Sequence, residues 1–350
     1  MVLPPLRALF QKRVAGDDAL LGLAKLRFQQ AGLAAEVYAD SPDQLEAVLP
    51  FVPADNLPPT VHLSRRLDLL RPADRDTVAA FARRFGGRVA GFVVHDRADM
   101  PARLDELEAA AAELSRVLAS SGPTRLFVEY AAGCEPADFL RLARRLLPID
   151  RVGVCVDTGH VGIRQARRSF ARRRPDAGDL AALDPADPRL PELAEDVQAS
   201  VAAGRSDVLE LITRLADQGK PVHHHLHDGH PLMQGLPDHR GFLTRLPVPF
   251  RHEGRWSLDM LFGPAGLAAI MTAAAGAYGP GLASFTLEIH EGGGRLALGD
   301  AAPLFRHWRD TSNAEQMNAW LNVLAENAAV VQGASSRPVG PGTVASSDPW

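Results

Sequence analysis

The sequence predicts a single (β/α)₈ barrel that occupies about residues 1–332, and three observations lead to that prediction. Short β-rich runs alternate with longer helical runs along most of the chain, as in parallel sheets with crossover helices. Seven such units are clear, and seven or eight units favour closure into a barrel. The length of 350 residues exceeds the roughly 250 that a minimal barrel needs, which leaves room for insertions.

The individual elements follow from local composition. Strands are predicted, in chain order, at 34–38, 60–63, 88–95, 126–130, 152–157, 221–227 and 284–289. The eighth strand would come first in the chain, within residues 2–14, where the pattern is poor. Helices are predicted at 17–30, 74–85, 102–119, 136–146, 208–218, 264–277 and 313–330, with another beginning at Ser41-Pro42 because serine caps helices and proline fits their first turn.

Two segments fall outside this repeat. Residues 164–205 form a predicted insertion before the strand at 221–227; it begins with six arginines and then becomes acidic and proline-rich. Residues 333–350 are rich in Gly, Ser and Pro and are predicted to be a disordered tail. The structural alternative is a doubly wound open sheet. No G-x-G-x-x-G motif follows the early strands, so we expect no nucleotide cofactor.

The composition is that of a globular protein with a sizeable core. The hydrophobic fraction is 46% and the formal net charge is −4, which does not favour polyanions as partners. Cys134 and Cys155 are too few for a disulfide framework, and Cys155 lies in an apolar run where burial is expected. Two prolines and an arginine interrupt residues 1–7, and the longest apolar stretch, near 268–278, is too short to span a membrane. A cytoplasmic protein without membrane contact is therefore expected.

Polar residues recur at the C-terminal ends of the predicted strands, where barrel enzymes place their active sites. Six strands carry a carboxylate or an imidazole there: His62, His95, Glu129, Asp157, His225 and Glu288. Carboxylates and imidazoles converging on one point would need a cation between them. Oxygen and nitrogen ligands without thiolates suit Mn²⁺, Zn²⁺, Co²⁺ or Mg²⁺. Strand alternation puts His223, His225 and His227 on one face, so the pattern does not separate His225 from His227 as the ligand.

The motifs Asp157-Thr-Gly-His160, His225-Leu-His-Asp228 and Leu-Glu288 resemble those of the xylose isomerase-like TIM barrels, over about residues 17–330. That family includes sugar-phosphate isomerases and epimerases and the endonuclease IV branch (AP endonuclease family 2). The resemblance to its ketose 3-epimerases implies one metal ion held by Glu129, Asp157, His225 and Glu288. It also implies that His160 contacts substrate, and we place His227 beside it in the substrate-binding set.

The endonuclease IV branch implies additional metal ligands at His62, His95, His160 and His239. In that branch an Asp-x-His motif completes a three-zinc site. Here Asp238 directly precedes His239 and Pro237 stands where the aspartate is expected. His62 and His95 also lack the neighbours that are usual in that branch.

Each of these residues also has a purely structural interpretation. The three carboxylates would then be buried partners of arginines, and the histidines would be hydrogen-bonded structural groups. His223, His224 and His230 are interpreted as neighbours of the ligands, and His252, His290 and His307 as structural or surface residues. The arginine cluster is either a solvated helix face or a phosphate-binding surface; its members are Arg164, Arg167, Arg168, Arg172, Arg173 and Arg174.

Three functions follow as alternatives. The first is isomerisation or epimerisation of a small carbohydrate or sugar phosphate, in which Glu129 and Glu288 remove and return a proton through a metal-bound enediolate. The second is an endonuclease IV-like phosphodiesterase acting on abasic DNA, although the net acidic charge counts against nucleic acid. The third is a non-catalytic metal-binding accessory barrel. The insertion at 164–205 would be a lid or a contact within a homo-oligomer.

Overall fold

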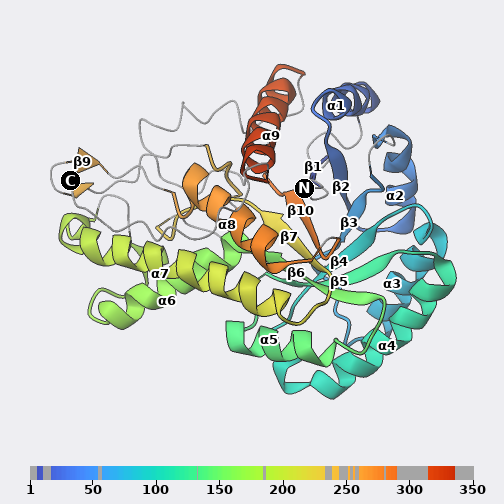
Figure 1. Cartoon of the computed structure of the whole chain (residues 1–350), viewed down its shortest axis with the longest axis horizontal. Helices are drawn as coiled ribbons and strands as arrows, with labels where there is room; N and C mark the ends of the chain where they lie inside the picture. The colour runs from blue at the N-terminus through green and yellow to red at the C-terminus, as the bar shows by residue number, and fades with distance from the viewer. Residues whose placement is uncertain are drawn as a thin grey trace.

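Eight parallel strands form a closed barrel in the computed structural model (Figure 1). The structure describes residues 6–10, 17–53, 57–131, 133–183, 187–232, 239–243, 251–252, 255–256, 260–279, 281–289 and 314–335. In chain order the barrel strands are β1 Leu6–Leu9, β2 Ala34–Ala39, β3 Thr60–Leu63, β4 Gly91–His95, β5 Arg125–Tyr130, β6 Val152–Asp157, β7 Val222–Leu226 and β10 Ala283–Leu287. β10 pairs with both β1 and β7 and so closes the barrel. The predicted fold class is confirmed, and the eighth strand lies within residues 2–14.

Helices surround the barrel and connect its strands. They are α1 Asp18–Gln30, α2 Pro42–Val48, α3 Pro72–Phe85, α4 Leu104–Ser121, α5 Pro136–Arg145, α6 Thr158–Arg173, α7 Leu190–Ala216, α8 Gly263–Ala277 and α9 Ala314–Ser335. Short 3₁₀ turns occur at Leu49–Phe51, Met100–Ala102 and Leu180–Ala182, and β8 (Arg251–His252) pairs with β9 (Arg255–Trp256). Among the described helices, none is both long and apolar enough to cross a lipid bilayer.

The segment predicted as an insertion is largely helical. Its first residues continue α6, a helix that was not predicted, and residues 190–205 form the first part of α7. The predicted helix at 208–218 is therefore only the end of a 27-residue helix. Pro191 lies in the first turn of α7, where proline is tolerated, so it does not interrupt the helix. Figure 1 shows α6 and α7 side by side on one flank of the barrel.

The C-terminal helix also extends further than predicted. α9 ends at Ser335 rather than near residue 330, so it includes the first residues of the predicted tail. The rest of that tail, 336–350, lies outside the described residues.

The turn from β6 into α6 fixes the position of two polar residues. Asp157 is the last residue of β6 and also the N-cap of α6, where its side chain accepts a hydrogen bond from the backbone N–H of His160 at 2.8 Å. Such capping satisfies a backbone donor that the helix itself cannot pair. The Asp157 carboxylate and the His160 side chain are thereby held at the same end of the barrel.

The barrel interior is only partly apolar. A small cluster of Val93, Phe127 and Cys155 is separate from the main core between barrel and helices. Phe127 fits because its neighbours are Gly91 and Gly153: a Cβ at Gly91 would lie 2.6 Å from the Phe127 ring. Cys155 is buried, as predicted. Next to this cluster, His223 packs on Phe127 and faces the fully buried carboxylate of Glu36 on β2.

The core between barrel and helices should be sensitive to truncation. We expect Phe85→Ala to lower the free energy of unfolding by about 3–5 kcal/mol, because Phe85 is fully buried at the end of α3 and its loss would leave a cavity. Urea denaturation would measure this. Leu26→Ala is the control, since Leu26 is 57% exposed and should change stability by less than about 0.5 kcal/mol. Equal effects of the two substitutions would contradict the packing described here.

Candidate metal centre

Strand register brings the predicted site residues together at the C-terminal end of the barrel. His95 on β4 pairs in register with Glu129 on β5, and Asp157 on β6 pairs with His225 on β7. Glu288 directly follows β10, and its backbone N–H donates to the carbonyl of Leu226 at the end of β7. Five neighbouring strand ends therefore present ligand-type side chains to one region.

The first group of ligand-type residues is His62, His95 and Glu129. Glu129 Oε2 lies 3.1 Å from His62 Nε2 and 3.3 Å from His95 Nε2. His62 Nδ1 lies 2.9 Å from the carbonyl oxygen of Leu63, which turns Nε2 toward the carboxylate. Two imidazoles and a carboxylate thus face one another across β3, β4 and β5.

The second group is Glu129, Asp157, His225 and Glu288, the four residues that the resemblance assigned to a single metal. His225 Nδ1 lies 2.9 Å from Glu129 Oε1 and 3.2 Å from Glu288 Oε2. All four side chains are buried. Glu129 belongs to this group and to the first, with one carboxylate oxygen directed toward each.

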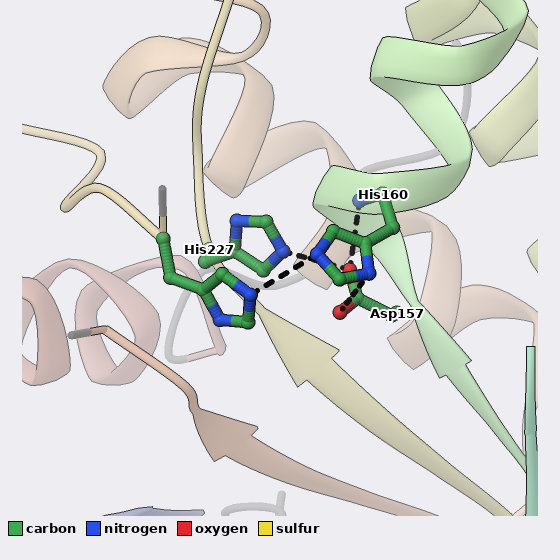
Figure 2. Close-up of side chains that lie close together, drawn as sticks. Asp157, His160 and His227 are labelled. Carbon is green, nitrogen blue, oxygen red and sulfur yellow. Dashed lines mark hydrogen bonds and ion pairs between the residues drawn. The ribbon is translucent and has the colours of Figure 1, made fainter. Parts of the chain in front are cut away.

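The third group is Asp157, His160, His227 and His239. Figure 2 shows Asp157 at the end of its strand, with His160 on the first turn of the following helix and His227 nearby. Asp157 Oδ1 lies 2.8 Å from His227 Nε2, and Asp157 Oδ2 lies 3.3 Å from His160 Nδ1. His239 Nε2 lies 3.1 Å from His160 Nε2. Asp157 is shared between the second and third groups, as Glu129 is between the first and second.

The donor sets suit divalent cations. In each group the ligand atoms lie within 4.8 Å of one another. Asp157 Oδ2 and Glu288 Oε2 are buried yet make no conventional hydrogen bond within the described part of the chain. Buried polar atoms normally have partners, because leaving one unpaired costs about 1–3 kcal/mol. Mixed imidazole and carboxylate donors fit Zn²⁺, Mn²⁺ or Co²⁺ without distinguishing among them.

Glu129 and Asp157 are ionised despite their burial, because neighbouring imidazoles lower the pKa of each. Burial alone would raise the pKa of Glu129, but the imidazoles of His225, His95 and His62 lower it well below its usual value. Burial also opposes ionisation of Asp157, yet His160 and His227 lower its pKa to about 2. In His227, burial is outweighed by Asp157, which raises the pKa to about 9. Positive charge is therefore favoured beside these carboxylates, which is the electrostatic requirement of a cation site.

The nine sequence-predicted site residues all lie in these groups. The structure separates two histidines that the sequence left equivalent: His225 faces Glu129 and Glu288, whereas His227 faces Asp157 and stacks on His239 with ring centroids 3.9 Å apart. His227 was placed in the substrate-binding set, yet its geometry is that of a ligand-type residue. Asp238, Pro237, His290 and His307, and the side chain of His252, lie outside the described residues.

Two residues at the site were not anticipated. Tyr38 on β2 stacks on the His62 ring, with centroids 4.4 Å apart, and its hydroxyl hydrogen-bonds to Glu288 Oε1. Glu36, two residues earlier, approaches His225 from inside the barrel. Neither Tyr38 nor Glu36 is the last residue of β2, so neither belongs to the predicted set of polar strand ends. The available signal was Glu36 itself, a carboxylate interrupting an otherwise apolar strand.

The other polar residues discussed from the sequence, His224 and the arginine cluster, do not belong to the ligand groups. His224 points away from the site and packs against Tyr278 and Phe285. Of the arginine cluster, Arg164 and Arg168 both pair with Glu135, which neutralises part of their charge. Arg167 donates to the carbonyl of Pro231. The cluster therefore belongs partly to the packing of α6 rather than to a free cationic surface.

The centre opens on one side. Most of its side chains are at most 6% exposed, whereas His95 is 23% and His160 is 12% exposed. These two residues belong to the first and third groups, so both outer groups reach the accessible side of the centre. A substrate would therefore approach between them.

No protein-family model matches the chain, and no curated protein matches its sequence. Among solved structures, a crystal structure of D-psicose 3-epimerase in the presence of D-fructose is similar, with 14% sequence identity and a TM-score of 0.48. The alignment covers 93% of this chain and 99% of that one. The barrel itself is established by its strand pairing.

Proposed function

We propose that this chain is a metal-dependent enzyme whose centre takes two or three divalent cations and that it hydrolyses a phosphate ester. One observation carries the proposal: five overlapping ligand groups occur among the described residues, and three of them, which together contain all nine predicted site residues, are joined through two shared carboxylates, Glu129 and Asp157. A single-metal centre requires only the middle group. His62 and His95 on one side, and His160, His227 and His239 on the other, would extend it to neighbouring ions.

Clustered divalent cations lower the pKa of water and neutralise charge on phosphoryl oxygens, which is the chemistry that such a centre supplies. In the overall reaction a water oxygen bonds to phosphorus, the bond to the leaving oxygen breaks, and that oxygen takes up a proton. Glu129 and Asp157 would space the ions. The partly exposed His95 and His160 would border the substrate, and the buried walls would hold it in position.

The proposed substrate is a small phosphate ester, such as a sugar phosphate, rather than DNA. The net charge of −4 provides no general attraction for a polyanion. The arginines on α6 offer only local positive charge, part of which Glu135 neutralises. Nicking of abasic-site plasmid remains the direct assay for the nucleic-acid alternative.

A sugar epimerase is the second candidate, and one observation favours it. Glu129 and Glu288 approach the same nitrogen of His225, so two carboxylates flank one point, as proton removal and return require. It ranks second because both oxygens of Glu129 face imidazoles, so that of this pair only Glu288, whose Oε1 bonds to Tyr38, keeps an oxygen (Oε2) without a conventional hydrogen bond among the described residues. A base that gives and takes protons needs an oxygen free for substrate.

Metal content and two assays on purified protein test the proposal. Elemental analysis after loading with Zn²⁺ or Mn²⁺ should give two or three ions per chain, and bis(p-nitrophenyl) phosphate or a sugar phosphate should be cleaved. One ion per chain, together with deuterium uptake by a ketose in D₂O and no phosphoester cleavage, would contradict the proposal and support epimerisation instead. A folded protein that binds no metal would overturn both.

We expect His95→Ala to remove one ion and leave the others bound. His95 contacts only the first group, and it is the most exposed member of the centre. Elemental analysis should therefore show about one ion fewer per chain, with phosphoester cleavage reduced. His224→Gln is a suitable control, because His224 points toward α8 and should leave metal content unchanged. Unaltered metal content in His95→Ala would mean that the first group holds no ion.

A further inference from the structure

Glu36 is a buried carboxylate that the proposed chemistry does not use. It lies on β2 and is fully buried. Its Oε2 accepts hydrogen bonds from Thr60 Oγ1 at 2.6 Å and Thr286 Oγ1 at 3.0 Å, and lies 3.1 Å from His223 Nε2. Its Oε1 lies 3.0 Å from His225 Nε2 and makes no conventional hydrogen bond among the described residues. One oxygen is therefore fixed by three groups, and the other is directed at His225.

His225 differs from the other imidazoles of the centre. His62, His227 and His239 each place Nδ1 about a hydrogen-bond length from a backbone carbonyl, at 2.9, 3.1 and 3.0 Å, which leaves Nε2 directed into the site. His225 is reversed: its Nδ1 faces Glu129 and Glu288, and its Nε2 faces Glu36. A neutral imidazole carries one proton, so a proton on Nε2 leaves the Nδ1 lone pair available as a ligand.

We propose that Glu36 is a positioning residue for the central metal site: it holds the proton of His225 on Nε2 and so presents Nδ1 as the ligand atom between Glu129 and Glu288. The inference rests on the metal centre of the proposed function. A carboxylate behind a ligand imidazole fixes the ring and strengthens it as a donor, and loss of such a partner typically weakens metal binding 10–100-fold. The backbone carbonyls behind His62, His227 and His239 carry no net charge, so His225 differs from these three histidines in being backed by an anion.

Glu36→Gln tests the proposal because it replaces the carboxylate oxygen beside His225 with an amide. If Thr60 and Thr286 continue to donate at the Oε2 position, the amide oxygen lies there and the NH₂ group lies against His225 Nε2. That nitrogen would then have to accept, and the proton would move to Nδ1, where it blocks the ligand position. We expect the affinity of one metal site to fall about 10–100-fold in a competition titration with a chromophoric chelator. The absorption spectrum of the Co²⁺-loaded protein should change as well.

Thr60→Val is the matched control. It removes one hydrogen bond to Glu36 but keeps the carboxylate beside His225, so it should change metal affinity less than threefold. If Glu36→Gln folds and binds Co²⁺ with wild-type affinity and spectrum, the proposal is wrong. It is equally wrong if Thr60→Val weakens binding as much as Glu36→Gln does, because the effect would then be general disturbance of the interior.

A measurement on the wild-type chain remains decisive if Glu36→Gln does not fold. In Zn²⁺-loaded protein with ¹⁵N-labelled histidine, long-range ¹H–¹⁵N correlations report which ring nitrogen carries the proton. We expect a metal-bound ring protonated on Nε2, with a signal that disappears in His225→Gln, and the rings of His62, His227 and His239 protonated on Nδ1. A His225 ring protonated on Nδ1 would overturn the positioning role alone. Wild-type protein without any bound metal would overturn the proposed function and this inference together.

Discussion

Glu129→Gln should have the largest effect on this centre, lowering kcat/KM for phosphoester cleavage at least ~10³-fold, which corresponds to about 4 kcal/mol of transition-state stabilisation. Glu129 belongs to two ligand groups, and its two oxygens face His62 and His95 on one side and His225 on the other. Its carboxylate is ionised, whereas glutamine keeps the shape and loses the charge. Elemental analysis should show the loss of up to two ions, and steady-state kinetics should show the loss of activity.

Glu135→Gln provides the control for this substitution. Glu135 lies six positions further along the chain, at the N-cap of α5, and pairs with Arg164 and Arg168 outside the ligand groups. Its replacement should leave metal content intact and kcat/KM within about twofold, since partly exposed ion pairs contribute little. If Glu129→Gln retained wild-type metal content, Glu129 would not link two ions, and the multinuclear centre would lose its main support.

The barrel could be predicted because its signals are local. Strands such as Thr60–Leu63 and Val152–Asp157 are short apolar runs with a polar residue at the end, and the structure reproduces both ranges. Closure of the barrel could be predicted only from the number of β/α units. The pairing of β1 with β10 leaves no local signal, because these strands are far apart in the sequence. The prediction failed at α6 and α7. Arginines, acidic residues and prolines are frequent there, so the apolar residues through which one helix packs on the other are hard to recognise as a helical pattern.

From the sequence, the site could be predicted only as a set of polar residues at the ends of strands. Glu129, Asp157 and Glu288 follow from the rule that parallel strands converge at one rim of a barrel. That rule cannot tell His225 from His227, because the choice depends on where β7 ends and on which carboxylate lies opposite. It also cannot find Glu36, which lies below the rim and acquires a role only when β2, β3, β7 and β10 surround it. Roles that depend on packing across the barrel require the three-dimensional structure.

The Asp-Thr-Gly-His motif contains a glycine whose importance is steric, and Gly159→Ala should disrupt the third ligand group. A Cβ at Gly159 would overlap the His227 ring. That ring has no easy escape: it is buried, faces Asp157 at 2.8 Å, lies 3.1 Å from the carbonyl oxygen of Asp228, and stacks on His239. We expect the free energy of unfolding of the metal-free protein to fall by about 1–3 kcal/mol, as for other overpacked sites, and one metal ion to be lost.

Gly276→Ala, in the last turn of α8, separates this clash from the general effect of replacing glycine in a helix. Nothing lies within 4 Å of a Cβ built there, so alanine should stabilise the protein by about 0.4–1 kcal/mol. Alanine at position 159 should bring the same gain in stability from helix propensity, but in the single variant the overlap with His227 opposes it. The double variant Gly159→Ala/His227→Ala should therefore be more stable than the sum of its single substitutions predicts, because removing the ring removes the overlap. Strict additivity would show that Gly159 and His227 do not contact each other, and that the glycine of this motif has some purpose other than giving His227 access to Asp157.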